Sequence, residues 1–550
     1  KGNISDVLQS IPAEHIKSIE VITSPTAKYD AEGDAGVINI ITNQKRLEGF
    51  NASLNTSTGT RVNRTSFNLN AGKNRFGISA SGGARYGWPR SGNTYFAHTL
   101  MDNLDNELRY QEREGDFIGN WIGFRGSVDV YYDFNQYSSI TSNFHIGGHK
   151  KSHKGETIGN GSSSFNYDPD FFNQYPNGVY EYEVDEDSEN DDTEYEYTIN
   201  YIKNFPNKEE QELMISFQYG GHIHDDNKNI IQVGYQPNII DNNMYGSGHE
   251  WTGQIDYTHP FNNKNKIEVG IKRINRYTSN DYTTALSNAN STWLNSDSLT
   301  NIFDYTQVVS AAYLSLNLNL INNFSLLIGS RYEYTNIIGE YFQTYNSFNN
   351  SYDNFVPSLI ISKKLNMFQN LKFSYVNRIQ RPDVHKVNTN IDIEDVNNIS
   401  KGNPELTPAQ VHQFEIGYNS FKPGLMTNFS LYYKSKDDVI ESFTFVRDDG
   451  VNETNYLNTG DNHSIGFNFY GSMNINKKLT LRGSFDVYTY NMETSINNVS
   501  LLRKSLNYNY MLNANLSLGK GYKIDSRIVF RSPRQTIQGE RPSFSMMSFG

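Results

Sequence analysis

The sequence predicts an all-β membrane protein, an antiparallel barrel of transmembrane strands with a small α+β unit packed inside it. Three observations lead to this fold class. Segments of about ten or more residues with alternating apolar and polar side chains recur from Gly49 to Gly550. Short and long connections alternate between these segments. The chain is rich in aromatic residues, with 38 Tyr and 32 Phe, although only 36% of its residues are hydrophobic.

Composition excludes several other classes of protein. No apolar run approaches the roughly 18–20 residues of a membrane-spanning helix, and a barrel is the other structure that satisfies every backbone group in lipid. Cysteine is absent, so no disulfide contributes to stability. The net charge of -12 disfavours nucleic acid as a partner, because phosphate binding needs a basic surface.

The first 45 residues form a unit different from the rest. A short helix is predicted to end near Pro12, followed by a strand at Ser18–Ile22 and a second strand, VINIIT. Gly33 and Gly36 allow the loop between the strands to adopt positive φ. The unit is too small to have a core of its own, so it must pack against another part of the chain.

The barrel segments show strand periodicity over an unusual length. Ile122, Phe124 and Val128 share one face of a segment whose opposite face carries Arg125 and Asp129. Strands of soluble sandwiches usually run about five or six residues, whereas many segments here run about ten to fifteen. This length suits a tilted strand that crosses a bilayer.

Connection lengths provide an independent test of the barrel. Asn135–Gln136 and Asn322–Asn323 are short turns. Four longer connections are interpreted as loops: Trp88–Phe117, Lys150–Asp192, Asp225–Ser247 and Pro382–Ala409. Outer-membrane barrels have short periplasmic turns and longer external loops. About twenty strands are counted in this way, including two long ones at residues 424–446 and 452–476.

The opening unit resembles the C-terminal half of the plug domain of TonB-dependent outer-membrane receptors. The resemblance rests on a proline before a short helical turn, an IEVI strand, a loop with Pro, Ala and Tyr, a Gly-x-x-Gly turn and an INI strand. It implies that this unit lies inside the barrel and blocks it. The residues taken as the plug motif are Pro12, Ile19, Glu20, Pro25, Tyr29, Gly33, Gly36 and Asn39.

A second resemblance to this family covers Tyr375–Tyr418. It consists of an Arg-Pro strand end, a long loop, a Gly-Asn-Pro-x-Leu-x-Pro turn and a returning strand. Barrels of the family close with 22 strands, which implies two strands beyond those counted. The residues of this barrel loop motif are Arg378, Arg381, Pro382, Gly402, Asn403, Pro404, Leu406 and Pro408.

The resemblance implies a division into a C-terminal plug half, residues 1–45, and an outer-membrane β-barrel, residues 46–550, truncated before its last strands. It implies active import of a scarce ligand, such as an iron siderophore or another large nutrient, across the bacterial outer membrane. The implied partners are outer-membrane lipid, a small or medium extracellular ligand and a TonB-type energising protein, which pulls a segment N-terminal to this chain. A surface lipoprotein is a further candidate partner, and no cofactor is expected.

Two alternatives remain open at this point. A passive channel or a surface binding scaffold would use the same barrel without energised import, and a TonB box before Lys1 would distinguish import from both. A soluble β-rich binding protein would be extracted without detergent, whereas a barrel depends on detergent and migrates differently after heating.

No catalytic motif is present, since a nucleophile elbow, an HExxH zinc motif and a phosphate loop are all lacking. An enzyme is therefore not expected, and no metal site is assigned. The acidic run Tyr180–Tyr197 offers carboxylates to hard cations, but it lacks the glycine-turned spacing of an EF-hand. It is interpreted as a solvated, self-repelling loop.

Histidines form the candidate ligand site. Because alternate side chains of a strand point to opposite faces, His145 and His149 are predicted on the inner face of one strand, and His222 and His224 on the inner face of another, two strands away. Imidazole at this density suits haem iron, a metal chelate or copper. The alternative interpretation is that polar lumen positions accept histidine without binding a ligand.

Charges predicted to face the lumen are expected to meet the plug or to line a hydrated gap. The resemblance implies that charged pairs hold the plug, with Lys17, Glu20 and Lys28 as candidate partners on the plug side. The wall residues are Arg125, Asp129, Arg331, Glu333, Glu415, Arg482, Asp486, Asp525 and Arg527.

Overall fold

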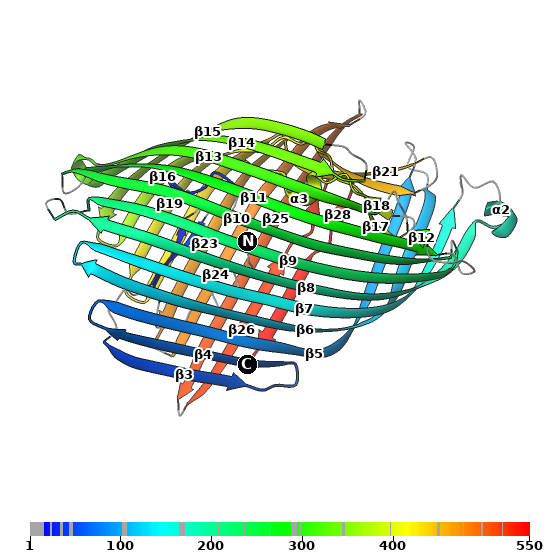
Figure 1. Ribbon diagram of the computed structural model, residues 1–550, viewed down its shortest axis with the longest axis horizontal. Helices are drawn as coiled ribbons and strands as arrows, with labels where there is room; N and C mark the ends of the chain where they lie inside the picture. The colour runs from blue at the N-terminus through cyan, green and yellow to red at the C-terminus, as the bar shows by residue number, and fades with distance from the viewer. Residues whose placement is uncertain are drawn as a thin grey trace.

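A computed structural model describes residues 16–22, 25–33, 37–42, 48–101, 107–163, 171–206, 208, 210–235, 237–262, 265–287, 294–295, 299–343, 347–395, 398–447, 451–476, 478–496, 499–519 and 521–550. Twenty long strands form an antiparallel barrel, in which β29 is the neighbour of β3 in the strand order. Figure 1 shows these strands side by side, with α2, β12 and β21 at one end.

The predicted barrel is therefore confirmed, and consecutive strands are neighbours around it. The barrel strands are β3 (Gly49–Ser57), β4 (Val62–Lys73), β5 (Phe76–Met101), β6 (Glu107–Asn135), β7 (Ser138–Ser163), β8 (Val179–Asn204), β9 (Glu212–Gly234), β10 (Asn238–Asn262), β11 (Asn265–Ser287), β13 (Asn301–Asn319), β14 (Phe324–Tyr341), β15 (Ser347–Asn366), β16 (Gln369–Gln380), β19 (Ala409–Lys422), β20 (Leu425–Asp437), β23 (Asp461–Ile475), β24 (Leu479–Ile496), β25 (Val499–Gly519), β26 (Tyr522–Arg531) and β29 (Phe544–Phe549).

The remaining elements are short. No helix in the described part of the chain is long and apolar enough to cross a membrane. These elements are β1 (Ile16–Ile22), β2 (Val37–Thr42), α2 (Phe171–Gln174), β12 (Leu294–Asn295), η2 (Ile321–Asn323), α3 (Val384–Val387), β17 (Asp392–Asp395), β18 (Asn398–Ser400), β21 (Ile440–Val446), β22 (Asn452–Asn458), β27 (Arg534–Gln535) and β28 (Glu540–Arg541).

The two strands predicted in the opening unit are confirmed. β1 and β2 pair antiparallel, with Glu20 opposite Asn39 and Ile19 opposite Ile40. Gly33 adopts a φ of 104°, as predicted for the loop between them. The predicted helix, Pro12 and Gly36 lie outside the described residues.

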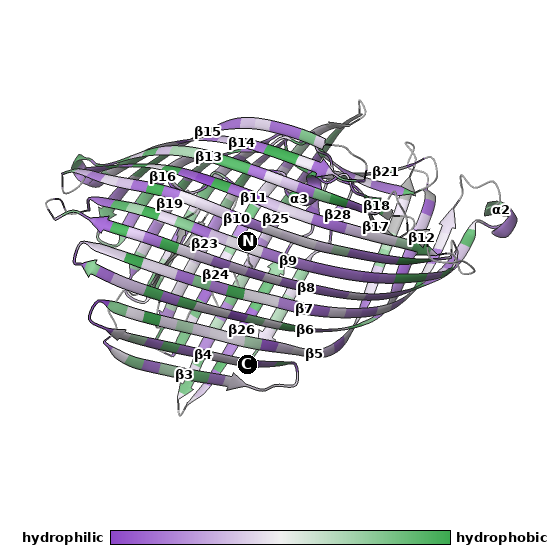
Figure 2. Cartoon of the chain, viewed as in Figure 1, coloured by the Kyte–Doolittle hydropathy of each residue, from purple (hydrophilic) through white to green (hydrophobic). Residues whose placement is uncertain are grey.

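Strand periodicity correctly assigned the two faces of the wall. On β6, Ile122 and Phe124 are exposed on the outer face, whereas Arg125 is half-buried on the inner face. On β13, Leu314 is exposed on the outer face and its neighbour Tyr313 is buried on the inner face. Figure 2 shows hydrophobic positions alternating with hydrophilic ones along many of the strands. The outer face can therefore contact lipid acyl chains.

We predict that Leu314→Arg destabilises the folded barrel in lipid vesicles by about 2–4 kcal/mol. Leu314 is exposed on the outer face, about 20 Å along the tilted strand from Leu320 at the short turn, which is the position expected of a residue near the bilayer midplane. The measurement is denaturant unfolding of the barrel in vesicles. Leu320→Arg is the matched control, since this leucine lies six residues further along the chain, exposed at the short turn. Its cost should be about 0–1 kcal/mol. Equal costs at the two positions would contradict this placement in the bilayer.

Three segments expected to be loops are instead extensions of barrel strands. Residues 88–101 and 107–117 form the outer parts of β5 and β6, and residues 150–163 and 179–192 form those of β7 and β8, with α2 at residues 171–174 between them. Asp225–Ser247 likewise belongs to β9 and β10. Above the bilayer both faces of a strand can be polar, so the apolar–polar alternation on which the prediction relied is weaker there, although Tyr180, Tyr182 and Val184 of β8 still alternate with exposed acidic residues. Backbone pairing nevertheless continues, because ladder hydrogen bonds do not depend on side-chain polarity.

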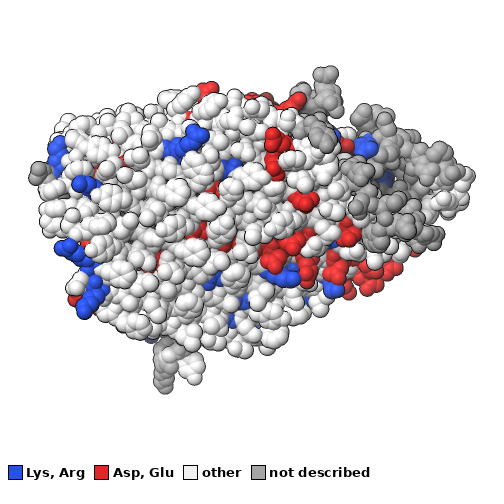
Figure 3. Space-filling view, viewed as in Figure 1, with Lys and Arg blue, Asp and Glu red and all other residues white. Residues whose placement is uncertain are grey.

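The acidic run Tyr180–Tyr197 was wrongly expected to be a loop, because it is the central part of β8. Its outer-face residues pair with lysines of β7: Lys154 with Asp187 at 2.6 Å and Lys150 with Glu189 at 2.9 Å. Figure 3 shows acidic residues gathered on the half of this face that carries the strand extensions. The acidic side chains of this run therefore lie on a β-sheet and not in a loop.

A small cap covers the outer end of the barrel. β17, β18, β22 and β21 form a four-stranded sheet, in which β18 and β22 pair in parallel. The long strands predicted at 424–446 and 452–476 are each divided, since β21 and β22 leave the wall and join this cap. An apolar cluster that includes Phe303, Val387, Leu406 and Ile440 fixes the cap to the barrel.

Candidate functional site

The opening unit contacts the barrel wall through the loop Pro25–Gly33 between β1 and β2, which is called the plug loop after the resemblance stated above. Its backbone forms a parallel bridge to the end of β16. Gly33 N–H donates to the Ile379 carbonyl at 2.9 Å, and Ile379 N–H donates to the Ala31 carbonyl at 3.0 Å. Ala31 packs with Ile379 and Val356 in a buried cluster. The loop is therefore attached to the wall as a short added strand.

Side chains of the wall also bind the loop backbone and Asp30. Arg378 donates from Nη2 to the Glu32 carbonyl at 2.6 Å and from Nε to the Gly33 carbonyl. Asp30 accepts from Lys272 Nζ at 2.9 Å and from Arg331 Nη2 at 3.2 Å. These contacts connect the loop to β11, β14 and β16 at once.

Glu32 completes the attachment. Its Oε2 lies 3.3 Å from Nη1 of both Arg276 and Arg381. Behind it, Glu333 accepts from Arg331 Nε at 2.5 Å and from Arg381, and it also receives Ala31 N–H at 3.4 Å. The arginines are held on both sides by carboxylates, one from the plug loop and one from the wall.

Burial makes this network energetically important. Arg331 and Glu333 are each 1% exposed, and Arg381 is 8% exposed. Removing one partner of a buried pair leaves an uncompensated charge, at a cost of about 3–5 kcal/mol. The cationic members are Lys272, Arg276, Arg331, Arg378 and Arg381, and the anionic members are Asp30, Glu32, Glu250 and Glu333.

The plug-side partners expected from the sequence differ from those observed. Lys28 makes no ion pair with a described residue, and the side chains of Lys17 and Glu20 lie outside the described set. Asp30 and Glu32 provide the charges instead. The signal missed was the acidic pair in Tyr-Asp-Ala-Glu-Gly, beside a glycine that brings the backbone against the wall. On the wall side, the expected Arg331 and Glu333 are both found in the network.

Other predicted lumen charges contact wall residues. Arg125 lies 3.7 Å from Glu194, Lys372 lies 3.9 Å from Glu415, and Tyr432 donates to Asp486 at 3.3 Å. Asp129 accepts from Asn143, and Arg527 donates to the sulfur of Met511 at 3.7 Å. Asp525 pairs through its backbone with Gly550, and Arg482 lies opposite Ser472 and Asn513 in the wall.

The barrel loop motif folds as one unit directly after Arg381 and Pro382. Gly402 N–H donates to the Asn388 carbonyl at 2.7 Å, and Asn403 N–H donates to the Lys386 carbonyl at 2.6 Å. A Cβ at Gly402 would lie 2.4 Å from the Asn388 oxygen, so only glycine fits this crossing. Asn350 binds the Pro404 carbonyl at 2.7 Å, and Leu406 is buried in the cap cluster. Pro408 directly precedes β19.

This unit forms one side of a cavity of about 380 Å³. β9 contributes His224, Asp226 and Lys228, and the loop contributes residues that include His385 and Lys401. Tyr282 also lines the cavity, six residues further out along β11 than Arg276. At about 3.3 Å per residue, the cavity lies about 20 Å along the strand from the ion-pair network.

The four predicted histidines divide into two groups. His149, Asp192 and His224 form one row across β7, β8 and β9, since Asp192 lies opposite both histidines. Asp192 Oδ2 lies 3.1 Å from His149 Nε2, and its Oδ1 lies 2.5 Å from His224 Nδ1. Of the four histidines, His224 also lines the cavity.

The second group lies nearer the membrane. Glu194 lies opposite His222, and His145 lies 4.0 Å from Glu194 and accepts from Arg125 Nε at 3.3 Å. His222 fills the space over Gly248, where a Cβ would lie 2.3 Å from its ring. Arg125 already neutralises the charge of Glu194 and donates to His145, so the side chains of this group are paired with one another.

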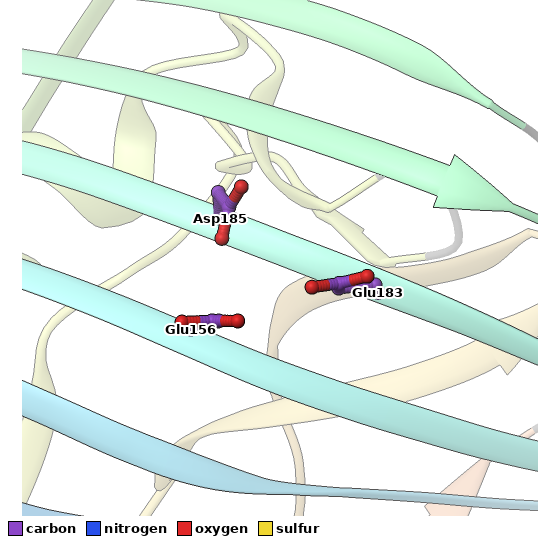
Figure 4. A group of neighbouring side chains, drawn as sticks. All are labelled: Glu156, Glu183 and Asp185. Carbon is purple, nitrogen blue, oxygen red and sulfur yellow. The ribbon is translucent and has the colours of Figure 1, made fainter.

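Carboxylates also cluster on the outer face. The oxygens of Glu156, Glu183 and Asp185 lie within 4.8 Å of one another, and within the described ranges this is the one His, Cys, Asp and Glu group that meets this distance. Figure 4 shows Glu183 and Asp185 on one strand and Glu156 on the neighbouring strand. The group continues the charged face of the strand extensions.

Comparisons with known proteins support the assignment of an outer-membrane β-barrel. The outer membrane protein beta-barrel family matches residues 203–550. A search of curated protein sequences found no match. Among solved structures, the siderophore receptor PiuA from Acinetobacter baumannii is similar, with 12% identity, a TM-score of 0.64 and coverage of 97% of this chain and 79% of that chain.

Two further structures show the same fold. The ferric yersiniabactin uptake receptor FyuA from Yersinia pestis has 11% identity and a TM-score of 0.58, covering 97% of this chain and 77% of that one. The copper transporter OprC has 11% identity and a TM-score of 0.56, covering 96% and 76%. The chain therefore belongs to the outer membrane protein beta-barrel family and lies in the bacterial outer membrane.

Proposed function

We propose that the chain imports a scarce ligand, such as a siderophore-bound iron or another large nutrient, across the outer membrane with energy from a TonB-type protein. The observation that carries this proposal is the polar attachment of the plug loop. Ion pairs and a short backbone bridge hold the loop Pro25–Gly33, and all of them can break and reform. A plug fixed by such contacts can be released by force applied to the chain that precedes it.

The position of the cavity supports the same function. It lies on the side of the plug loop that carries the cap, where external loops meet the wall. The segment from Arg381 to Asn388 runs from the ion-pair network to the cavity lining within eight residues. A ligand in the cavity thus contacts the same segment that holds Glu32. The solved receptors with this fold include siderophore receptors by name, which supports iron chelates as the first class to test.

The experiment is growth of a receptor-deficient bacterium that expresses the full-length protein, on defined iron sources, with and without its TonB-type partner. We expect growth on at least one source only when both proteins are present. Growth without the energising partner would show a passive channel. Ligand binding at the cell surface without growth on any source would show a scaffold. Mass spectrometry of a co-purified ligand would identify the substrate.

A further inference from the structure

We propose that His149, Asp192 and His224 form a binding site for a divalent transition-metal ion, taken either as the free ion or as the exposed metal of a small chelate. The inference rests on the proposed import function only in naming a ligand class for the cavity. The site itself is a property of the folded wall, and it can be measured without transport.

The three side chains are brought together by strand register. Three neighbouring strands each contribute one residue of the same row, on the same inner face. Adjacent strands lie about 4.8 Å apart, so β7 and β9 are about 10 Å apart on either side of β8. Two imidazoles reaching inward from this separation can meet a single ion over the central carboxylate.

The donor set suits a transition metal. Two imidazole nitrogens and one carboxylate oxygen are common ligands of Zn²⁺, and imidazole also suits Cu²⁺ and Ni²⁺. Asp192 contacts both rings, one through each carboxylate oxygen. The ligand atoms of this row do not all lie within 4.8 Å of one another, so binding requires the two rings to turn from these oxygens towards a shared point, with metal–nitrogen distances of about 2.0–2.1 Å.

One atom of this group is poorly satisfied at present. His149 Nε2 is shielded from solvent and makes no hydrogen bond, although it lies 3.1 Å from Asp192 Oδ2. Buried polar nitrogens normally have a hydrogen-bond partner, so such an atom requires an explanation. A metal ion at this position would supply the missing partner.

The neighbouring charges distinguish the row of His149, Asp192 and His224 from the group that contains His145 and His222. Arg125 lies beside Glu194 and His145 and repels a cation from that group. Among the described side chains, no Lys or Arg forms an ion pair with His149, Asp192 or His224. The row opens on one side through His224 into the cavity, whose lining also includes Lys228 and Lys401. The cavity holds about 380 Å³, which leaves room for water or for the organic part of a chelate on the metal.

The test is isothermal titration of the purified full chain in detergent with Zn²⁺, Cu²⁺ or Ni²⁺ alone, and with the same metals as citrate complexes. We expect one equivalent to bind to the unmodified protein. His149→Ala combined with His224→Ala should weaken binding by more than about 100-fold, since even changes outside the ligand set cost about 10–100-fold. Asp192→Asn should weaken it less. Binding of the metal alone identifies the free ion, and binding of only the citrate complex identifies the chelate.

His153→Ala is the matched control, because this residue lies on the same strand and face and stacks on Phe117 at 5.0 Å. It should leave the affinity unchanged. Heat-dependent migration checks that each variant is folded, and nitrogen couplings in the Cu²⁺ electron spin resonance spectrum report the two imidazoles. Undiminished binding in the double variant, or the absence of binding in the unmodified protein, would overturn the site. Failure of energised growth with metal binding intact would overturn import alone.

Discussion

Replacing Asp30 with Asn and Glu32 with Gln together should release the plug loop from the wall. The double variant leaves Arg276, Arg331 and Arg381 without their partners on the plug, and the last two are buried. The expected cost is about 3 kcal/mol, the lower end of the range for a broken buried pair, because the two carboxylates are themselves about one-third exposed. Hydrogen exchange at the amides of Gly33 and Ile379 should accelerate about 100-fold.

The control for this prediction is Lys28→Gln, which changes a charge on the same loop at a residue with no ion pair among the described side chains. Its exchange rates should match those of the unmodified protein. Unchanged exchange in the double variant would contradict the electrostatic attachment. In that case the backbone bridge to Ile379 and the packing of Ala31 would hold the loop by themselves.

Gly402→Ala should open the loop that forms one side of the cavity. The new Cβ would lie 2.4 Å from the Asn388 oxygen and 2.7 Å from the Lys386 oxygen, both backbone atoms that cannot rotate away. The two segments must separate, at a cost of about 1–3 kcal/mol for overpacking and about 0.5–1.5 kcal/mol for each hydrogen bond lost. Tryptic cleavage after Lys386 and Lys401 should accelerate at least about tenfold.

Gly253→Ala provides the comparison for this substitution. This residue lies in the wall strand β10, and a Cβ there would meet no atom within 4 Å. Its cleavage pattern should remain that of the unmodified protein. If Gly402→Ala also left the tryptic cleavage pattern unchanged, Gly402 would pack less closely against Asn388 than the structure indicates.

The wall could be predicted from the sequence because lipid imposes a strict rule on each strand. A residue such as Leu314 must be apolar where it faces acyl chains, while Tyr313 faces inward, so the alternation marks both the strand and its faces. The same rule fails above the bilayer, where water contacts both faces. The outer parts of β5 to β10 carry polar side chains on both faces over much of their length, although Tyr180, Tyr182 and Val184 of β8 are buried in alternation with exposed acidic residues, and these parts were misread as loops.

The site was only partly predictable, for a different reason. The alternation of side chains along a strand predicted that His149 and His224 face inward, and this prediction needs only the sequence of each strand. The register that places Asp192 between them depends on pairing across three strands, which no local pattern records. The contacts of Asp30 and Glu32 join residues more than 240 positions apart, and nothing in the loop itself specifies which arginines it will meet.

If the loop Pro25–Gly33 is released as proposed, the ion-pair network also sets the polarity of the passage behind it. Asp30 and Glu32 would leave with the loop, and five cations of the network would then face two of its carboxylates, those of Glu250 and Glu333. The five cations are Lys272, Arg276, Arg331, Arg378 and Arg381. A ring with this excess of positive charge attracts an anion and repels a bare cation. In the proposed import, a metal would therefore cross this ring more easily inside a negatively charged chelate than as a free ion, and the residues that hold the plug loop would also act as a charge filter.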